Sequence, residues 1–146
     1  MGHEAAAVTK AWGDVLAADS TLMSVVSNQI FAGTAPISAT EPYVVGRQRT
    51  PGSDEYVFGG VRASSEPLID IGICVADDEH SSAARTGANR IDDRLNELSD
   101  YSVTVDGVTF KISVLRESGA WIRPEVENGR KFFWVGGSYR FYVCRA

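Results

Sequence analysis

The sequence contains little of what catalytic, metal-binding and disulfide-stabilised sites usually require. Its 146 residues include only two histidines and two cysteines. A nucleophilic site that depends on histidine would have to use His3, next to the chain end, or His80. Cys74 and Cys144 both fall in strand-like segments, where cysteine usually behaves as a small hydrophobic residue, so we expect no disulfide. The composition therefore predicts no enzyme: no catalytic residues and no cofactor.

Positive charge and long apolar runs are also scarce. Lys and Arg number 14 against 19 Asp and Glu, which gives a net charge of -5. This balance argues against a general nucleic-acid-binding protein, although a local basic patch remains compatible with it. No apolar run approaches the roughly 20 residues of a membrane span, and the segment Met1–Ala5 lacks the basic and apolar regions of a signal peptide. We therefore expect that the protein is made in a cytoplasm and that it does not associate with a membrane.

Metal-ligand residue types cluster at one place, Asp77-Asp78-Glu79-His80. Four consecutive residues at the start of a helix point in different directions, whereas metal sites usually draw their ligands from separated positions. We therefore interpret this segment as the start of a helix capped by Asp77 or Asp78, with the acids opposing the helix dipole, and we expect no bound metal.

A buried strand followed by a helix forms the centre of the predicted fold. The run Leu68–Val75 is apolar and rich in β-branched residues, which is typical of a central strand. Apolar residues then recur at helical spacing on one face of Ser82–Leu98. An apolar fraction of 44% is sufficient for one packed core, so residues 1–146 are expected to form a single domain.

The remaining segments complete a two-layer arrangement. Asp106-Gly107 between two alternating segments predicts a β-hairpin with a type I′ turn. Gly136-Gly137 predicts a bulge or tight turn within the closing strand, and Leu115–Asn128 fits no single element. The fold class is therefore predicted as α+β, with a mostly antiparallel β-sheet covered on one face by two helices. The other expected elements are an N-terminal helix (Glu4–Ala18), a short helical turn (Thr21–Val26) capped by Asp19 or Ser20, a brief strand at Ile30-Phe31, a strand (Tyr43–Arg49), the hairpin strands (Tyr101–Val105 and Val108–Val114) and a closing strand (Arg130–Arg145).

The segment Thr50–Gly60 has the least core-like pattern in the sequence. It combines glycines, a proline, two acids and two aromatic residues, and this predicts a long excursion between strands. The preceding strand ends in arginines, which are favoured over lysines at protein interfaces. We therefore predict that this region contacts another protein chain, through Arg47, Arg49, Asp54, Glu55, Tyr56 and Phe58.

Several of these segments occur in an order that resembles a known family. They are Asp19-Ser20-Thr21-Leu22 followed by Ile30-Phe31, the stretch from Ala35-Pro36 to Glu41-Pro42-Tyr43-Val44-Val45, the strand end Ile73-Cys74-Val75 before an alanine-rich helix, and the closing aromatic strand. Together they cover nearly the whole chain. The sequence resembles the tail terminator, or tail completion and tail-to-head joining, proteins of long-tailed bacteriophages.

The resemblance implies a structural role in a virion. Proteins of this family form a sixfold ring on the head-proximal end of the tail tube, stop tube polymerisation and present a surface to the head connector. The expected partners are therefore other copies of the chain, the tail tube protein and a connector or neck protein, with DNA passing through the lumen without specific binding.

Three alternatives remain open. The first is another neck or head-completion adaptor protein of the virion, distinguished by whether the protein binds the connector or the tube. The second is a small enzyme, which would require a pocket with convergent polar groups. The third is a nucleic-acid-binding module that stacks bases on the aromatic residues of Phe132–Tyr142, a reading that the net charge disfavours.

Overall fold

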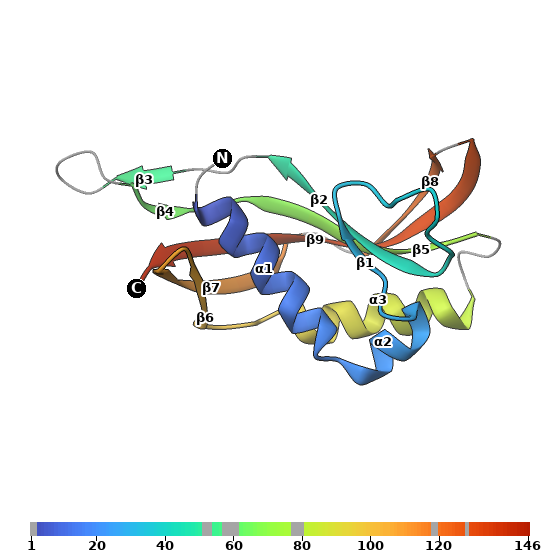
Figure 1. Cartoon of the computed structure of the whole chain (residues 1–146), viewed down its shortest axis with the longest axis horizontal. Helices are drawn as coiled ribbons and strands as arrows, with labels where there is room; N and C mark the ends of the chain where they lie inside the picture. Colours follow the sequence, from blue (N-terminus) through green and yellow to red (C-terminus); the bar gives the residue numbers. More distant parts are fainter. Residues whose placement is uncertain (1–2, 51–53, 57–61, 77–80, 118–119, 128) are drawn as a thin grey trace.

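The computed structural model describes residues 3–50, 54–56, 62–76, 81–117, 120–127 and 129–146. A layer of helices packs on one face of a curled β-sheet (Figure 1), which confirms the α+β prediction. The helices are α1 (His3–Ala17), α2 (Ser20–Val26) and α3 (Ser82–Leu95). The strands are β1 (Ile30–Ala32), β2 (Tyr43–Thr50), β3 (Asp54–Tyr56), β4 (Arg62–Ser65), β5 (Leu68–Val75), β6 (Tyr101–Val105), β7 (Val108–Arg116), β8 (Trp121–Glu127) and β9 (Arg130–Arg145).

The long strand β9 organises the sheet. It pairs with β5 and then β4 along one edge, and with β8 and then β7 along the other. The path through the sheet is β1-β2-β5-β9-β4-β3; β7 and β8 branch from β9 outside this path, and β6 pairs with β7. Only the β1–β2 pair is parallel among the described strands, so the sheet is mostly antiparallel, as predicted.

All eight residues of β5 are buried, because both faces of this strand are covered. Ile69, Ile71 and Ile73 belong to the main core beneath the helices, which also contains Trp12 of α1. Cys74 instead belongs to a smaller apolar cluster on the opposite face. That cluster consists of Ala35, Ala39, Tyr43, Val45, Cys74, Phe132 and Trp134. Cys144 is exposed, and no disulfide joins the two cysteines.

Helix α3 is shorter than the sequence pattern predicted. Its N-cap is Ser81, whose hydroxyl accepts from the Ala84 N–H, so the prediction of Asp77 or Asp78 as cap is wrong, and both residues lie outside the described part of the chain. The helix ends at Leu95 instead of Leu98, because the backbone of Glu97 and Leu98 exchanges hydrogen bonds with Val114 of β7. The apolar Leu98 therefore continues the helical spacing without being helical.

Two glycines that predicted a break in the closing strand are instead part of a continuous strand. β9 runs unbroken through Gly136 and Gly137, and Gly136 lies opposite Gly72 of β5. A Cβ atom at Gly136 would lie 2.5 Å from the Gly72 Cα atom and closer still to the Ile71 carbonyl oxygen. The prediction of a bulge or turn is therefore wrong: the glycine permits a close approach of two backbones.

The predicted hairpin is confirmed. β6 and β7 pair in register around Asp106 and Gly107, whose φ angles are 50° and 79°. Positive φ at both positions is the requirement of a type I′ turn. The segment Leu115–Asn128, which fitted no single element in the sequence, contains the last two residues of β7 and the whole of β8.

Candidate functional site: the helix-free face of the sheet

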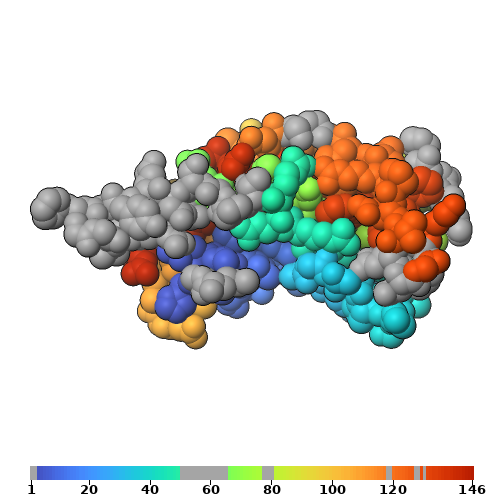
Figure 2. Space-filling model, turned by 90° about the horizontal axis from the view of Figure 1, so that it is seen from above, coloured from blue at the N-terminus to red at the C-terminus, as the bar shows by residue number. Residues whose placement is uncertain are grey.

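Polar and aromatic side chains gather on the face of the sheet that the helices do not cover. Arg47 of β2 lies opposite Asp70 of β5, and Asp70 lies opposite Ser138 of β9. Seen from above, residues of β2 and β8 lie side by side on the molecular surface (Figure 2). We call this set the arginine cluster, and it consists of Arg47, Arg49, Asp70, Trp121, Arg123, Trp134 and Ser138.

A buried carboxylate lies at the centre of the arginine cluster. Asp70 is only 6% exposed and accepts hydrogen bonds from Arg49 Nη2 at 2.8 Å and Arg123 Nη1 at 2.8 Å. The fully buried Ser138 hydroxyl donates to Asp70 Oδ1 at 2.7 Å. A buried charge requires such partners, because unpaired burial of a carboxylate is costly. Asp70 therefore fixes two guanidinium groups side by side at the surface.

The charge of Asp70 is maintained by its neighbours. Burial by itself raises the pKa of this carboxyl, but hydrogen bonds from Arg123, Ser138 and Arg49, together with the charge of Arg123, have the larger combined effect. The pKa of Asp70 therefore lies below its ordinary value of 3.8. The carboxylate is therefore charged at neutral pH.

Two indole rings hold the arginines against the sheet. The Arg123 guanidinium carbon lies 4.0 Å from the Trp121 ring centroid, and that of Arg47 lies 4.9 Å from the Trp134 centroid. The two indoles meet edge to face at 4.7 Å, and Trp121 Nε1 donates to Ser138 Oγ at 3.0 Å. Stacking on aromatic faces restricts the guanidinium planes, which leaves pre-oriented donors at the surface.

The arginine cluster presents groups that form contacts with other molecules. Its side chains offer guanidinium donors, indole faces and one carboxylate that is already fully hydrogen-bonded. These groups suit recognition of another macromolecule. Among the residues that the structure describes, no group of three His, Cys, Asp or Glu side chains could hold a metal ion. None of the described helices combines the length and the apolar character that a membrane span requires.

A second buried carboxylate links two helices on the other side of the sheet. Asp19 is the N-cap of α2, and its carboxylate accepts from the Leu22 N–H at 2.8 Å. The same carboxylate binds Arg90 and Arg94 of α3. Burial by itself raises the pKa of Asp19, but these hydrogen bonds have the larger effect and hold the pKa well below its ordinary value. This interaction stabilises the helical layer.

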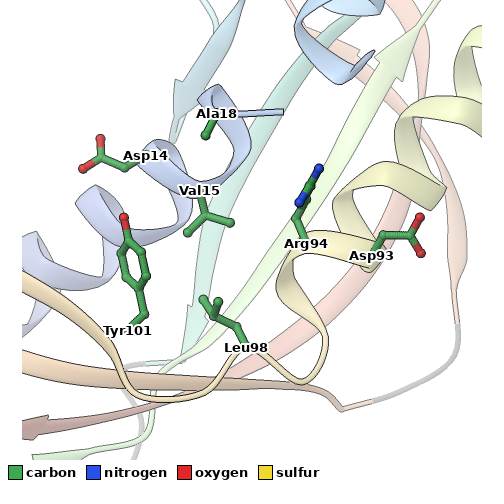
Figure 3. Close-up of a pocket in the computed structure, with 7 residues that line it drawn as sticks. All are labelled: Asp14, Val15, Ala18, Asp93, Arg94, Leu98 and Tyr101. Atoms are coloured by element: carbon green, nitrogen blue, oxygen red, sulfur yellow. The ribbon is translucent and has the colours of Figure 1, made fainter. Parts of the chain in front are cut away.

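An open groove lies between the C-terminal ends of α1 and α3 (Figure 3). Val15 and Leu98 lie close together in its centre, and Asp14 and Asp93 lie on its two sides. The groove has a volume of about 290 Å³. Its lining residues are Asp14, Val15, Ala18, Asp93, Arg94, Leu98 and Tyr101.

The structure brings together only part of the predicted contact set. Arg47 and Arg49 lie in the arginine cluster. The backbone of Asp54, Glu55 and Tyr56 forms β3, which pairs with β4 and projects from the body of the molecule (Figure 1). The side chains of these three residues, and the whole of Phe58, lie outside what the structure describes.

Sequence reasoning missed Asp70, Trp121, Arg123 and Ser138. The signal for Asp70 was present, because it is the one charged residue in an otherwise apolar strand. Its partners Arg123 of β8 and Ser138 of β9 lie 53 and 68 residues further along the chain, and no local pattern relates them to it.

Comparison with known proteins relates the fold to that of a virion component. No protein-family model and no curated protein matches the chain. Among solved structures, a chain described as "Virion of native gene transfer agent (GTA) particle" gives a TM-score of 0.66 over 100% of both chains, at 19% identity. Another solved structure gives a TM-score of 0.52 at 11% identity, covering 97% of this chain and 96% of its own. At these identities the likeness shows the shared fold.

Proposed function

We propose that this protein is a structural virion protein that forms a ring at the head-proximal end of a phage-like tail tube. The ring ends tube polymerisation and joins the tail to the head connector. The observation that carries the proposal is the likeness, over the full length of both chains, to a chain from a gene transfer agent virion. The sequence resemblance to tail terminator proteins supports the same role.

The two sides of the molecule differ in a way that suits a ring between unlike partners. One side is a layer of helices (Figure 1), and the other carries the arginine cluster. A ring requires heterologous contacts, in which one surface of a subunit meets a different surface of the next. The ring must also bind the tube on one side and the connector on the other, so a subunit needs several chemically distinct surfaces.

The arginine cluster and the β3–β4 hairpin are the proposed contacts with other subunits or with the adjoining ring. Pre-oriented Arg and Trp side chains of the kind found around Asp70 are enriched at the centres of protein interfaces. β3 projects away from the rest of the chain, where a neighbour can reach it. The proposed contact residues are Arg47, Arg49, Asp54, Glu55, Tyr56 and Phe58. DNA passes through the lumen of the ring without sequence-specific contacts.

A tube-growth assay tests this function. Purified tail tube protein is allowed to polymerise with increasing amounts of the chain, and tube lengths are measured by electron microscopy. A terminator shortens the tubes and stops growth at one end at substoichiometric amounts. Unchanged lengths, together with binding to isolated head connectors, would instead support the alternative of a neck or head-completion adaptor.

A further inference from the structure

An exposed apolar and basic surface runs along one face of the β8–β9 hairpin. Val126 of β8 is 66% exposed and lies directly opposite the exposed Lys131 of β9. Ile122, four residues before Val126 and therefore on the same face of β8, is 46% exposed. We call Ile122, Val126 and Lys131 the hairpin surface. Large apolar side chains that are exposed together often mark an interaction site.

The groove between α1 and α3 has the complementary character. Its centre is apolar, with Val15, Leu98 and the ring of Tyr101 (Figure 3). Asp14 and Asp93 lie at its sides and pair with Lys10 at 3.0 Å and Arg90 at 3.8 Å. Both carboxylates are more than half exposed, and exposed pairs of this kind are weak, so they leave the acids open to a further cation.

The surroundings of the groove add negative charge. Glu97 and Asp100 flank the lining residues Leu98 and Tyr101, and neither forms an ion pair with the described residues. Among the described residues that line the groove, the one cation is Arg94, which is already bound by the buried Asp19. The groove therefore offers an apolar centre within an acidic rim, which matches an apolar side chain next to a lysine.

A chain cannot fill its own groove with its own hairpin surface. The groove lies between the C-terminal ends of α1 and α3, whereas the free end of the β8–β9 hairpin curls away from the helical layer (Figure 1). Two complementary surfaces at different places on one subunit produce a heterologous contact, which repeats from subunit to subunit and can close into a ring.

We propose that the hairpin surface of one copy docks in the groove between α1 and α3 of the next copy. Val126 packs against Val15 and Leu98, and the ammonium group of Lys131 lies among the carboxylates of the rim. The occupant is a second copy of this chain, because the same molecule carries both complementary surfaces. This inference rests on the proposed ring, and it specifies which surfaces close it.

Charge exchange between exposed positions tests the proposed contact. Lys131→Asp and Asp93→Lys each place like charges across the contact, and Val126→Asp puts a charge in its apolar centre. Each variant is expected to weaken self-association by about tenfold or more, measured by sedimentation and by native mass spectrometry. The double variant Lys131→Asp/Asp93→Lys restores opposite charges across the contact and should regain most of the wild-type association.

Controls separate this contact from a general loss of stability. Leu115→Asp and Lys111→Asp make the same changes at exposed positions of β7, and should leave association unchanged. Circular dichroism checks that every variant is folded. The inference is overturned if Val126→Asp and Leu115→Asp associate equally well, or if the double variant does not regain association. Either result leaves the proposed function open, because the tube-growth assay can still succeed. A wild-type chain that does not self-associate, even on tube ends, overturns both the inference and the proposed ring.

Discussion

The buried carboxylate of Asp19 provides a direct test of how the helical layer is stabilised. Replacing it with alanine removes the N-cap of α2, a loss of about 1 kcal/mol, and also the interaction with two arginines of α3. Removing one partner of a buried ion pair costs about 3–5 kcal/mol when the other charge stays buried. Here Arg90 and Arg94 are 30% and 49% exposed and can turn towards water, so the cost is smaller. We expect Asp19→Ala to lower the unfolding free energy by about 2–4 kcal/mol in total.

Urea unfolding followed by circular dichroism measures this change. Asp19→Asn keeps a side chain that can cap α2 but loses the negative charge, so its destabilisation should be about half as large. Asp14→Ala is the matched control, because its exposed pair with Lys10 is expected to contribute at most about 1 kcal/mol. The reasoning is refuted if Asp19→Ala is no less stable than Asp14→Ala, or if Asp19→Asn loses as much stability as Asp19→Ala.

Three further predictions follow from the fold and the site. Gly136→Ala should destabilise the protein by about 2–3 kcal/mol in urea unfolding, since its Cβ would strike backbone atoms of β5; Gly13→Ala, where no atom lies within 4 Å, is the control. Because the pKa values of Asp19 and Asp70 are lower in the folded than in the unfolded chain, the unfolded chain binds more protons just below pH 3.8. Unfolding free energy should therefore fall as the pH drops below 3.8, and a flat acid profile would contradict this. Deleting residues 53–58 should leave a folded chain that assembles poorly on tubes, and normal tail joining by the deletion variant would refute that contact.

Local patterns were sufficient to predict several elements. Asp106-Gly107 specifies a hairpin because few residues tolerate positive φ at two consecutive positions. The apolar run of β5 and the helical spacing of α3 predicted the centre of the fold for the same reason, since each signal is contained in a short window. The glycine at position 136 was misread, because close packing between β5 and β9 depends on residues 64 positions apart.

The candidate site was less predictable than the fold. The sequence showed Arg47 and Arg49 only as the basic end of a strand. Their surroundings are formed by Asp70, Trp121 and Arg123, which come from other strands. Register between distant strands decides which side chains meet, and that register depends on packing of the whole sheet. A sequence can therefore show that arginines are present without showing which carboxylate orients them.

Electron microscopy of purified tail tubes mixed with this protein tests the central proposal most directly. We expect ring-shaped density on one end of each tube, with no further growth from that end when tube subunits are added. Density on neither end, with tubes that continue to grow at both, would contradict it.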